Sequence, residues 1–215
     1  MPDRETLKTN AQRWGYLRAM YHALMEFLSP SVCIARIALR ELGPGDPYGD
    51  ISNARRYPIR VATRNELLQA VQAMPDRMNP NFIDCALSRG DFCVAAFDDS
   101  EIVAFIWCSF GTAPDVGDIW VAFPEYCRYS HKLYTKPAYR GQRIMDTHLS
   151  DHLSRARGAT HAVSIIETHN YASMARNRWQ GKPFVGFAGY IQIGNSALCF
   201  RSPGAKKLGF KFYKA

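Results

Sequence analysis

The strongest constraint on the fold is the alternation of short apolar runs with amphipathic helical patterns after residue 56. Short apolar runs bounded by turn residues predict strands, and apolar residues three and four positions apart predict helices. Such an order is typical of a mixed sheet covered by helices. Strands are predicted at residues 59–62, 92–97, 102–110, 126–135, 162–166, 184–193 and 197–200, with weaker strands at 119–123 and 207–213; helices are predicted at 65–74, 81–87, 144–153 and 170–179.

The first 56 residues form a separate segment in this pattern. Residues 12–28 predict one helix, because large apolar side chains recur at three- and four-residue steps and Pro30 follows. Residues 31–42 indicate a strand, and the Gly-, Pro- and Asp-rich residues 43–50 indicate a linker. The sequence therefore predicts an N-terminal extension, residues 1–56, and a main domain, residues 57–215.

The composition excludes two broad classes of protein. The chain has 215 residues, 47% hydrophobic and 21% charged, which excludes disorder as its main state. It contains no apolar run of about 18 residues, so we expect no transmembrane helix. The first ten residues are polar and carry no apolar stretch, so we expect a cytoplasmic protein without a secretory signal. In that compartment the six cysteines, which form no C-x-x-C pair, should be reduced thiols.

Positive charge is concentrated in the C-terminal part of the chain. Residues 127–215 hold 15 basic and 3 acidic side chains, a net charge of +12, whereas the whole chain has +8. A field of this sign favours a polyanionic ligand, such as cofactor phosphates, nucleic acid or an acidic protein. The sequence has no helix-turn-helix, zinc-finger or RNP pattern, so we expect no nucleic-acid partner.

The most informative segment is the basic junction at residues 134–144, with the sequence YTKPAYRGQRI. Here a predicted strand enters a turn containing Gly141, and a predicted helix follows directly. Free N–H groups at a helix N-terminus bind phosphate oxygens, and a glycine lets the backbone approach them closely. Arg140 and Arg143 add guanidinium donors. The junction predicts an anion site, the alternative being a solvated basic loop; it is neither a P-loop nor a G-x-G-x-x-G turn.

Residues 136–149, KPAYRGQRIMDTHL, resemble motif A of the GNAT superfamily of acyl-CoA N-acyltransferases. In that motif a strand–loop–helix with the pattern Q/R-x-x-G-x-G/A wraps the pyrophosphate of acetyl-CoA. Residues 57–68, 92–110 and 170–181 resemble further pieces of the family in the same order, so the similarity spans about residues 57–201. The resemblance implies an α+β, three-layer αβα fold: a mixed, mostly antiparallel sheet of six or seven strands flanked by helices, here with an N-terminal helical extension.

The resemblance also implies a donor site and a reaction. The donor would be acetyl-CoA, or another acyl-CoA or acyl carrier protein thioester, and no metal would take part. A base deprotonates the acceptor amine, which attacks the thioester without a covalent enzyme intermediate. The implied donor-binding residues are Leu133, Tyr134 and Thr135, along which pantetheine lies, the loop residues Arg140, Gly141, Gln142, Arg143 and Ile144, and Asn170 and Ser173 of the later helix.

The sequence departs from the family pattern at three positions. Arg143 stands where motif A has its glycine, and Met145 stands where the motif closes with glycine or alanine. Arg143 would either contact phosphate itself or indicate a different acyl carrier. Asn177 occupies the position where many relatives carry a general-acid tyrosine, so that acid is missing or comes from elsewhere.

Three residues are candidates for the base. Glu125 precedes a strand, His131 lies within that strand and has a suitable pKa range, and Glu167 follows the predicted strand at 162–166. For each one the alternative is a structural or solvated side chain. Cys127 is a weaker candidate, since thiols inside apolar strands usually belong to the core.

Several alternatives remain open at this stage. The acceptor is a small-molecule amine or an amino acid. Long-chain N-acyl amino acid synthases of the same superfamily take their donor from acyl carrier protein, which is acidic and suits the basic C-terminal part; a non-catalytic basic binding module is the competing class. His148 and His152 are four residues apart, but without a third ligand or an H-E-x-x-H motif they predict no metal site.

The aromatic-rich helix at residues 12–28 is expected to be covered. It would pack on the main domain and narrow the substrate site, dock against a second subunit in a homodimer, or lie on a membrane. Glu26 and the net charge of only +2 over residues 1–57 disfavour the membrane.

Overall fold

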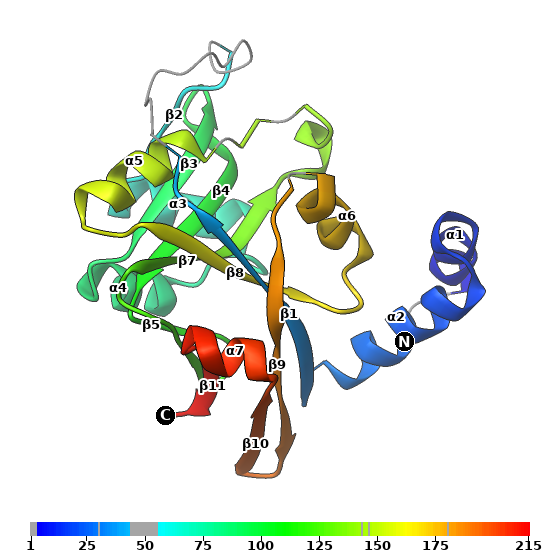
Figure 1. The fold of residues 1–215 in the computed structure, drawn as a ribbon. Helices are drawn as coiled ribbons and strands as arrows, with labels where there is room; N and C mark the ends of the chain where they lie inside the picture. The colour runs from blue at the N-terminus through cyan, green and yellow to red at the C-terminus, as the bar shows by residue number, and fades with distance from the viewer. Residues whose placement is uncertain (1–3, 30, 44–55, 143, 146, 180) are drawn as a thin grey trace. The chain divides into compact units, whose positions relative to one another are not determined.

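The computed structural model describes residues 4–29, 31–43, 56–142, 144–145, 147–179 and 181–215 (Figure 1). The chain forms two compact units, each assembled from separate stretches of sequence. The first comprises Met1–Arg40, Thr112–Pro124 and Ser164–Ala215, and the second comprises Glu41–Gly111 and Glu125–Val163. The predicted linker and boundary fall on residues 44–55, outside the described residues, so the division at residue 56 stays a prediction.

The second unit contains a mostly antiparallel sheet with the order β2-β3-β4-β7. β8 begins in this unit and runs parallel to β7, with the register Cys127↔His161 to Tyr129↔Val163. The apolar runs predicted these strands to within about two residues. Their bounds are β2 Ile59–Val61, β3 Phe92–Asp98, β4 Glu101–Phe110, β7 Cys127–Thr135 and β8 His161–Glu167.

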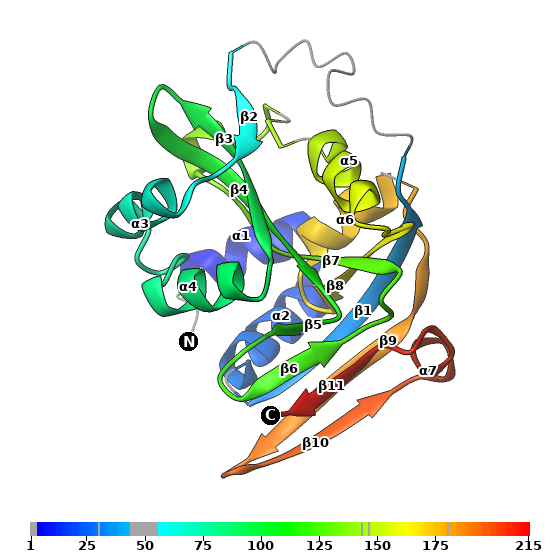
Figure 2. The same ribbon diagram turned by 90° about the vertical axis from the view of Figure 1, so that its left-hand side faces the viewer.

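Helices cover both faces of this sheet (Figure 2). α3 (Arg64–Ala73) and α4 (Pro80–Ser88) lie on one face, where Leu67 and Ile83 share an apolar cluster with Phe105. α5 (His148–Ala156) lies on the other face, where Leu149 packs against Ile106. The mixed, mostly antiparallel sheet with flanking helices that the sequence implied is therefore confirmed.

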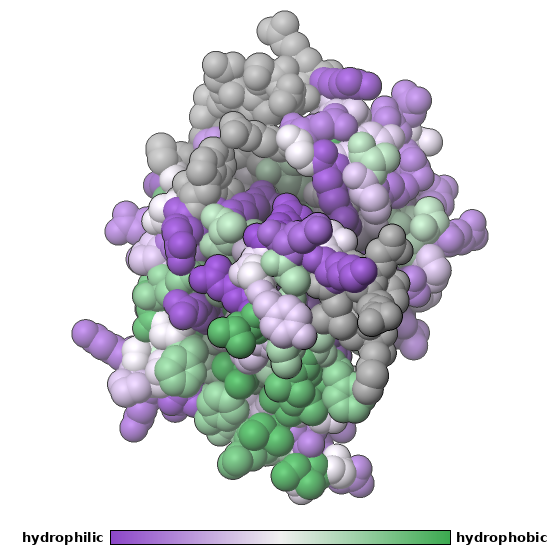
Figure 3. All heavy atoms as spheres, turned by 90° about the vertical axis from the view of Figure 1, so that its right-hand side faces the viewer, coloured by the Kyte–Doolittle hydropathy of each residue, from purple (hydrophilic) through white to green (hydrophobic). Residues whose placement is uncertain are grey.

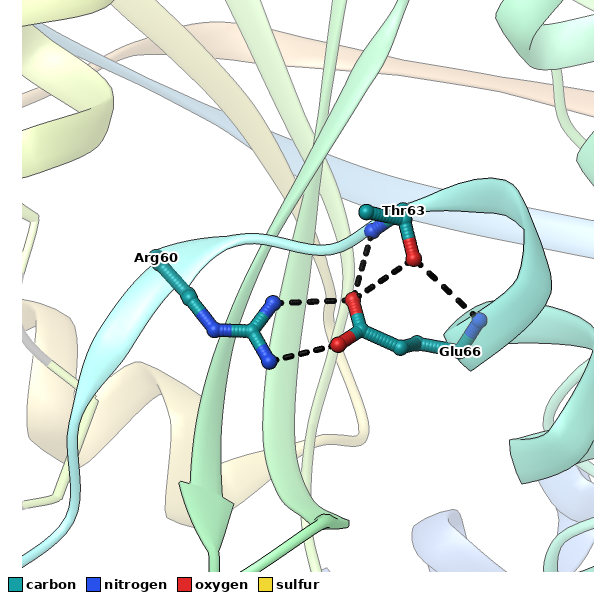
Figure 4. Close-up of polar contacts among 3 residues, drawn as sticks. All are labelled: Arg60, Thr63 and Glu66. Carbon is teal, nitrogen blue, oxygen red and sulfur yellow. Dashed lines mark hydrogen bonds and ion pairs between the residues drawn. The ribbon is translucent and has the colours of Figure 1, made fainter.

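The start of α3 shows how the sequence sets a helix boundary (Figure 4). Thr63 Oγ1 accepts from the Glu66 amide at 3.4 Å, and the Glu66 carboxylate accepts from the Thr63 amide at 2.8 Å. This reciprocal pair is a capping box, which satisfies two otherwise unpaired N–H groups. The Arg60 guanidinium donates two hydrogen bonds, of 2.5 and 2.8 Å, to the same carboxylate. The hydrogen bonds from Arg60 and Thr63 lower the pKa of Glu66 to about 2.

The first unit contains two antiparallel strand groups, with the orders β10-β9-β1 and β11-β6-β5. The strand expected at residues 31–42 is β1, which pairs with β9. Residues 207–213 do not form one strand as predicted, because Ser202 caps a short helix and Gly209, with φ +84°, ends it before β11. The bounds are β1 Val32–Glu41, β5 Thr112–Pro114, β6 Ile119–Ala122, α6 Tyr171–Trp179, β9 Phe184–Ile193, β10 Ser196–Arg201, α7 Pro203–Leu208 and β11 Lys211–Lys214.

The single helix predicted at residues 12–28 is instead two helices. α1 (Arg4–Trp14) and α2 (Tyr16–Leu28) meet at Gly15, which has φ +88°. A left-handed backbone cannot continue a right-handed helix, and glycine adopts it without steric cost, so the helix breaks there. The apolar residues keep their helical spacing on both sides of Gly15, so the sequence pattern did not indicate this break.

α2 packs within the first unit through its polar side. The Tyr21 hydroxyl lies 2.6 Å from Thr168 Oγ1, and the His22 ring meets the His169 ring edge-on. The apolar stripe of α2 is exposed, with Leu17 the most exposed at 83%. Figure 3 shows apolar side chains gathered over α2 and the β9–β10 hairpin. The members of the α2 stripe are Tyr16, Leu17, Met20, Leu24 and Phe27.

Candidate active site

The loop between β7 and α5 carries the predicted anion-binding residues. Its first turn is a short 3-10 helix, Pro137–Tyr139, and Gly141 follows with φ +80°, where glycine is strongly favoured. Arg140 Nε donates to the carbonyl of Thr135 at 3.1 Å, and Gln142 Nε2 donates to the carbonyl of residue 138 at 3.3 Å. Both side chains are exposed, and each donates a hydrogen bond to a nearby backbone carbonyl. These two hydrogen bonds constrain the path of the loop backbone.

Buried side chains fix the later part of this loop. Ile144 is 4% exposed and shares an apolar cluster with Tyr57 and Val103, and Met145 packs against the same cluster. The Tyr57 hydroxyl also donates to Gln142 Oε1 at 3.3 Å. The loop is therefore held at Gln142 by the Tyr57 hydroxyl and at Ile144 by the apolar cluster that includes Val103 of β4.

The helix predicted from residue 144 begins only at His148, after Thr147. Ile144 and Met145 are not helical, and Ile144 is buried, which the helical spacing of the sequence did not reveal. The predicted phosphate donors at Gln142 and Ile144 thus lie in a loop rather than at a helix N-terminus. Arg143 lies outside the described residues, and its contact with phosphate stays a prediction.

A β-bulge interrupts β7 just before this loop. Phe105 is paired with Tyr134 and Trp107 with His131, so residues 132 and 133 of β7 stand opposite a single residue of β4. Lys132 has φ +50°, which is uncommon for a residue with a side chain. Bulges are frequent beside active sites, because they turn backbone groups away from the ladder. The predicted pantetheine residues Leu133 and Thr135 lie in and just after this bulge.

His131 is a neutral imidazole on β7. Its Nε2 lies 2.8 Å from Ser109 Oγ, and its ring stacks on Tyr129 with centroids 5.0 Å apart. Burial, aided by the positive charges of Lys132 and Arg89, lowers the pKa of His131 to about 3. The imidazole is therefore unprotonated at neutral pH, but it is a weak base.

Ser109 connects His131 to a buried carboxylate. Asp91 is 4% exposed and accepts hydrogen bonds from Ser109 and from Arg89, the latter at 2.7 Å. Burial raises the pKa of Asp91, and the two hydrogen bonds oppose that rise. The Ser109 hydroxyl thus lies between the His131 imidazole and the Asp91 carboxylate.

The other two candidates on this stretch have different surroundings. Glu125 is an exposed residue in the turn before β7. Cys127 is fully buried at the start of β7, and burial raises its thiol pKa to about 11. A thiol with that pKa stays protonated at neutral pH, so Cys127 serves the core rather than catalysis.

Glu167 belongs to the first unit, where it is the last residue of β8. Its Oε2 lies 3.2 Å from Nε2 of His169, which is buried. Directly afterwards, Asn170 Oδ1 accepts from the Ser173 amide at 3.0 Å, so Asn170 is the cap of α6 as the sequence indicated. Asn177 is buried and donates from Nδ2 to the Lys182 carbonyl at 2.8 Å. That hydrogen bond joins the last turn of α6 to the segment that follows the helix.

The described residues divide the predicted site between the two units. The second unit holds Glu125, His131 and the loop after β7, and the first unit holds Glu167, Asn170 and Ser173. No pattern in the sequence singles out Asp91, Ser109 or His169, because each one is defined by a partner on another element. Among the described residues, no group of three or more His, Cys, Asp or Glu side chains is arranged to hold a metal ion.

A mostly antiparallel sheet with a bulged strand, a basic glycine-containing loop and a following helix defines the class of GNAT-type acyltransferases. The sequence model of the "Acetyltransferase (GNAT) family" matches residues 62–181, more than half of the chain. The chain therefore belongs to this family, and the protein is a GNAT-type N-acetyltransferase. The resemblance seen in motif A is thereby confirmed.

Solved structures of low sequence identity align with this chain, and the first of them has a similar fold. A structural-genomics protein from Drosophila aligns with a TM-score of 0.50 and 14% identity, covering 85% of this chain and 59% of its own. A conserved protein of unknown function from Staphylococcus epidermidis has a TM-score of 0.48 and 11% identity, covering 88% and 80%. An acetyltransferase from Trypanosoma brucei has a TM-score of 0.43 and 14% identity, covering 58% and 91%. No curated protein matches the sequence. Within the described residues, no helix combines the length and the apolar character needed to cross a membrane.

Proposed function

We propose that the protein transfers an acetyl group from acetyl-CoA to the amine of a small-molecule acceptor, such as an amino acid, in the cytoplasm. Family membership supports the donor. The observation that carries the proposal is the basic loop after β7, in which Gly141 adopts φ +80° beside the exposed Arg140 and Gln142. The six cysteines are all unpaired, which suits a reducing compartment.

In this proposal the loop holds the donor and β7 orients its thioester. Arg140 and the amides of Gly141–Ile144 bind the phosphates, with Arg143 as a further donor, while pantetheine follows Leu133–Thr135. Backbone N–H groups at the β7 bulge would polarise the thioester carbonyl. The acceptor amine forms a C–N bond to the carbonyl carbon, the C–S bond breaks, and CoA leaves as a thiolate that takes a proton from water. The amine's own proton passes to a base.

We assign the base role to Glu167 in preference to the other two candidates. The low pKa of His131 makes it a weak proton acceptor, and its Nε2 is already engaged with Ser109. Glu125 is exposed in a turn, and no hydrogen bond or ion pair to another described residue orients it. Glu167 is held at a strand end by a buried imidazole. This selection leaves Glu125 and His131 as controls for the same experiment.

The donor site is tested by Gly141→Val. A β-branched residue cannot adopt φ +80° without strain, so the loop must change its path and CoA-dependent thermal stabilisation should disappear. Gly158→Val is the matched control, since Gly158 has φ +85° and equally open surroundings but follows α5. Both variants should lose some stability, and only Gly141→Val should lose the response to CoA. An unchanged CoA response in Gly141→Val would contradict the donor site. Arg143→Gly should also weaken CoA binding; a gain in affinity would show that Arg143 obstructs CoA.

The base is tested by comparing Glu125→Ala, His131→Ala and Glu167→Ala with a panel of amines. Removing the base should abolish its contribution to the acidic limb of the pH–rate profile, because no enzyme group then has to be deprotonated for activity and only the acceptor amine still titrates. We expect this only for Glu167→Ala, with a rate loss of about 10²–10⁴-fold. A retained limb in that variant would move the assignment to whichever of the other two loses it.

A second donor class is favoured by one observation, the net charge of +12 over residues 127–215. A field of that strength would also attract acyl carrier protein, whose surface is acidic. Thermal shifts with CoA and with acyl carrier protein, each at low and high salt, separate the two donors. Stabilisation by the carrier alone, lost at high salt, would replace CoA as the donor in this proposal.

A further inference from the structure

A buried histidine, His169, connects α2 to Glu167, the residue to which we assign the base role. His169, 4% exposed, directs Nε2 toward two carboxylates at once, Glu167 Oε2 and Glu26 Oε1, each at 3.2 Å. Glu26 comes from α2 and Glu167 from the end of β8, and both are about half-exposed. One step along the chain, Tyr21 of α2 contacts Thr168 Oγ1 at 2.6 Å. Two consecutive residues after β8 are therefore held by the same helix.

The chemistry of the three groups fixes where the proton lies. Carboxylate oxygens only accept hydrogen bonds, so the Nε2 that faces Glu26 and Glu167 carries the proton. The other nitrogen, Nδ1, is buried and has no hydrogen-bond partner among the described residues. A buried N–H without a partner is costly, whereas a lone pair there costs less. His169 therefore offers one N–H, and the two glutamates compete for it.

We infer that His169 is a positioning residue for Glu167, and that Glu26 of the N-terminal extension competes for the same N–H and so sets how well Glu167 accepts a proton. This inference rests on the proposed function, in which Glu167 is the base. The His169 N–H, with Nε2 3.2 Å from Glu167 Oε2, attracts the Glu167 carboxylate and orients it. The nearby negative charge of Glu26 acts in the opposite direction, because like charges disfavour ionisation.

Other charged and titratable groups face this cluster from every element packed around it. Glu167 interacts electrostatically with Cys33 of β1 and Tyr190 of β9, and Asp115, next to β5, acts on both of these residues. From α2, His22 meets the His169 ring edge-on and Arg18 lies over the Tyr171 ring of α6. These groups stay the same in the variants below, so a change between variants reports on His169 and Glu26.

The test compares the acidic limb of kcat/KM in four variants. His169→Leu removes the N–H, so the limb should move to higher pH by about one unit, a tenfold loss of kcat/KM on that limb. His169→Gln, whose Nε2 is also a donor, should restore the wild-type limb. Glu26→Gln removes the negative charge and leaves only a neutral, weaker acceptor, so the limb should move to lower pH. Tyr21→Phe is the control: it loosens α2 at Thr168 without changing charge and should leave the limb in place.

Opposite shifts for His169→Leu and Glu26→Gln support the inference, because a merely structural role lowers activity at every pH. If Glu167→Gln abolishes the limb but neither variant moves it, Glu167 is the base and the inference is overturned. If Glu167→Gln keeps the limb, the proposed base itself is wrong and the inference falls with it. Should His169→Leu fail to fold, Glu26→Gln and His169→Gln still decide, since the Glu26 side chain is about half-exposed.

Discussion

At the scale of single residues, the second unit contains a buried ion pair that none of the sequence motifs indicated. Arg128 of β7 is 1% exposed, and its guanidinium lies 3.0 Å from the Asp151 carboxylate of α5. A buried charge is tolerated only with its partner, because removal from water is costly. The pair joins the strand before the donor loop to the helix after it.

We predict that Asp151→Asn destabilises the protein by about 3–5 kcal/mol, since it leaves the Arg128 charge buried without its counterion. Urea unfolding measures the change. Asp84→Asn is the control, because the Arg64–Asp84 pair is exposed and should leave the unfolding midpoint unchanged. The double variant Arg128→Met with Asp151→Leu should recover most of the lost stability. A loss no larger for Asp151→Asn than for Asp84→Asn would show that the buried pair is not needed.

A second residue-scale prediction concerns pH. The pKa of His131 is about 3 in the folded chain, against about 6.5 for an unfolded histidine. Folding therefore favours the neutral form, and the resulting stability is present above pH 6.5 and is lost as the pH falls toward 3. We expect His131→Gln to reduce the difference in unfolding free energy between pH 7 and pH 5. Exposed His152 provides the control, since His152→Gln should preserve that difference.

Residue types were predictable from the sequence, but their partners were not. His131 and Glu167 stood out because their side chains can move protons, and Asn170 because it precedes a helical pattern. Ser109 and Asp91 look like ordinary residues at a strand end and a strand start until the antiparallel register brings them near His131. His169 likewise has no signal apart from Glu26, 143 positions earlier in the chain.

At the scale of elements, the apolar runs predicted strands better than helix starts. A strand is marked by its own side chains, but a helix start also depends on local contacts. α3 began where the Thr63–Glu66 pattern predicted, because the capping box lies within four residues. α5 began later than predicted because Ile144 is held by Tyr57 and Val103, which are distant in sequence.

The cap of α3 gives the element-scale prediction. Thr63→Ala should lower the unfolding free energy by about 1 kcal/mol, since the Glu66 amide loses its acceptor. Thermal and urea unfolding measure this loss. Thr63→Ser keeps the hydroxyl and should stay close to wild type, whereas equal losses in both variants would point to packing of the Thr63 methyl group rather than to the cap.

At the scale of the whole molecule, the N-terminal extension precedes the residues that match the family model. Its residues 1–40 belong to the first unit. The role of α1 and α2 can be separated from that of β1 in an experiment, because β1 is a strand that pairs with β9, whereas α1 and α2 are helices. The exposed stripe on α2 leaves the second-subunit and membrane alternatives as predictions.

We predict that deleting residues 1–28 and deleting residues 1–52 have different outcomes. The shorter deletion removes α1 and α2 and should leave a folded, CoA-responsive protein that lacks the effect of Glu26. The longer deletion also removes β1, exposes an edge of β9 and should aggregate. Circular dichroism and light scattering separate the outcomes, and light scattering of the full chain reports whether it is a dimer. A soluble, folded product of the longer deletion would show that β9 does not need β1.

The pairing of β1 with β9 also has a consequence for biosynthesis. β1 ends at Glu41, and its partner begins only at Phe184. At about 5–20 residues per second, a ribosome needs roughly 7–30 s to make the intervening chain. During that interval the nascent first unit carries an apolar strand that lacks its neighbour β9, and its other neighbour, β8, also comes late, at His161–Glu167. Production of the protein should therefore depend on chaperones that bind nascent chains, and slowing translation between these strands should lower the yield of folded protein.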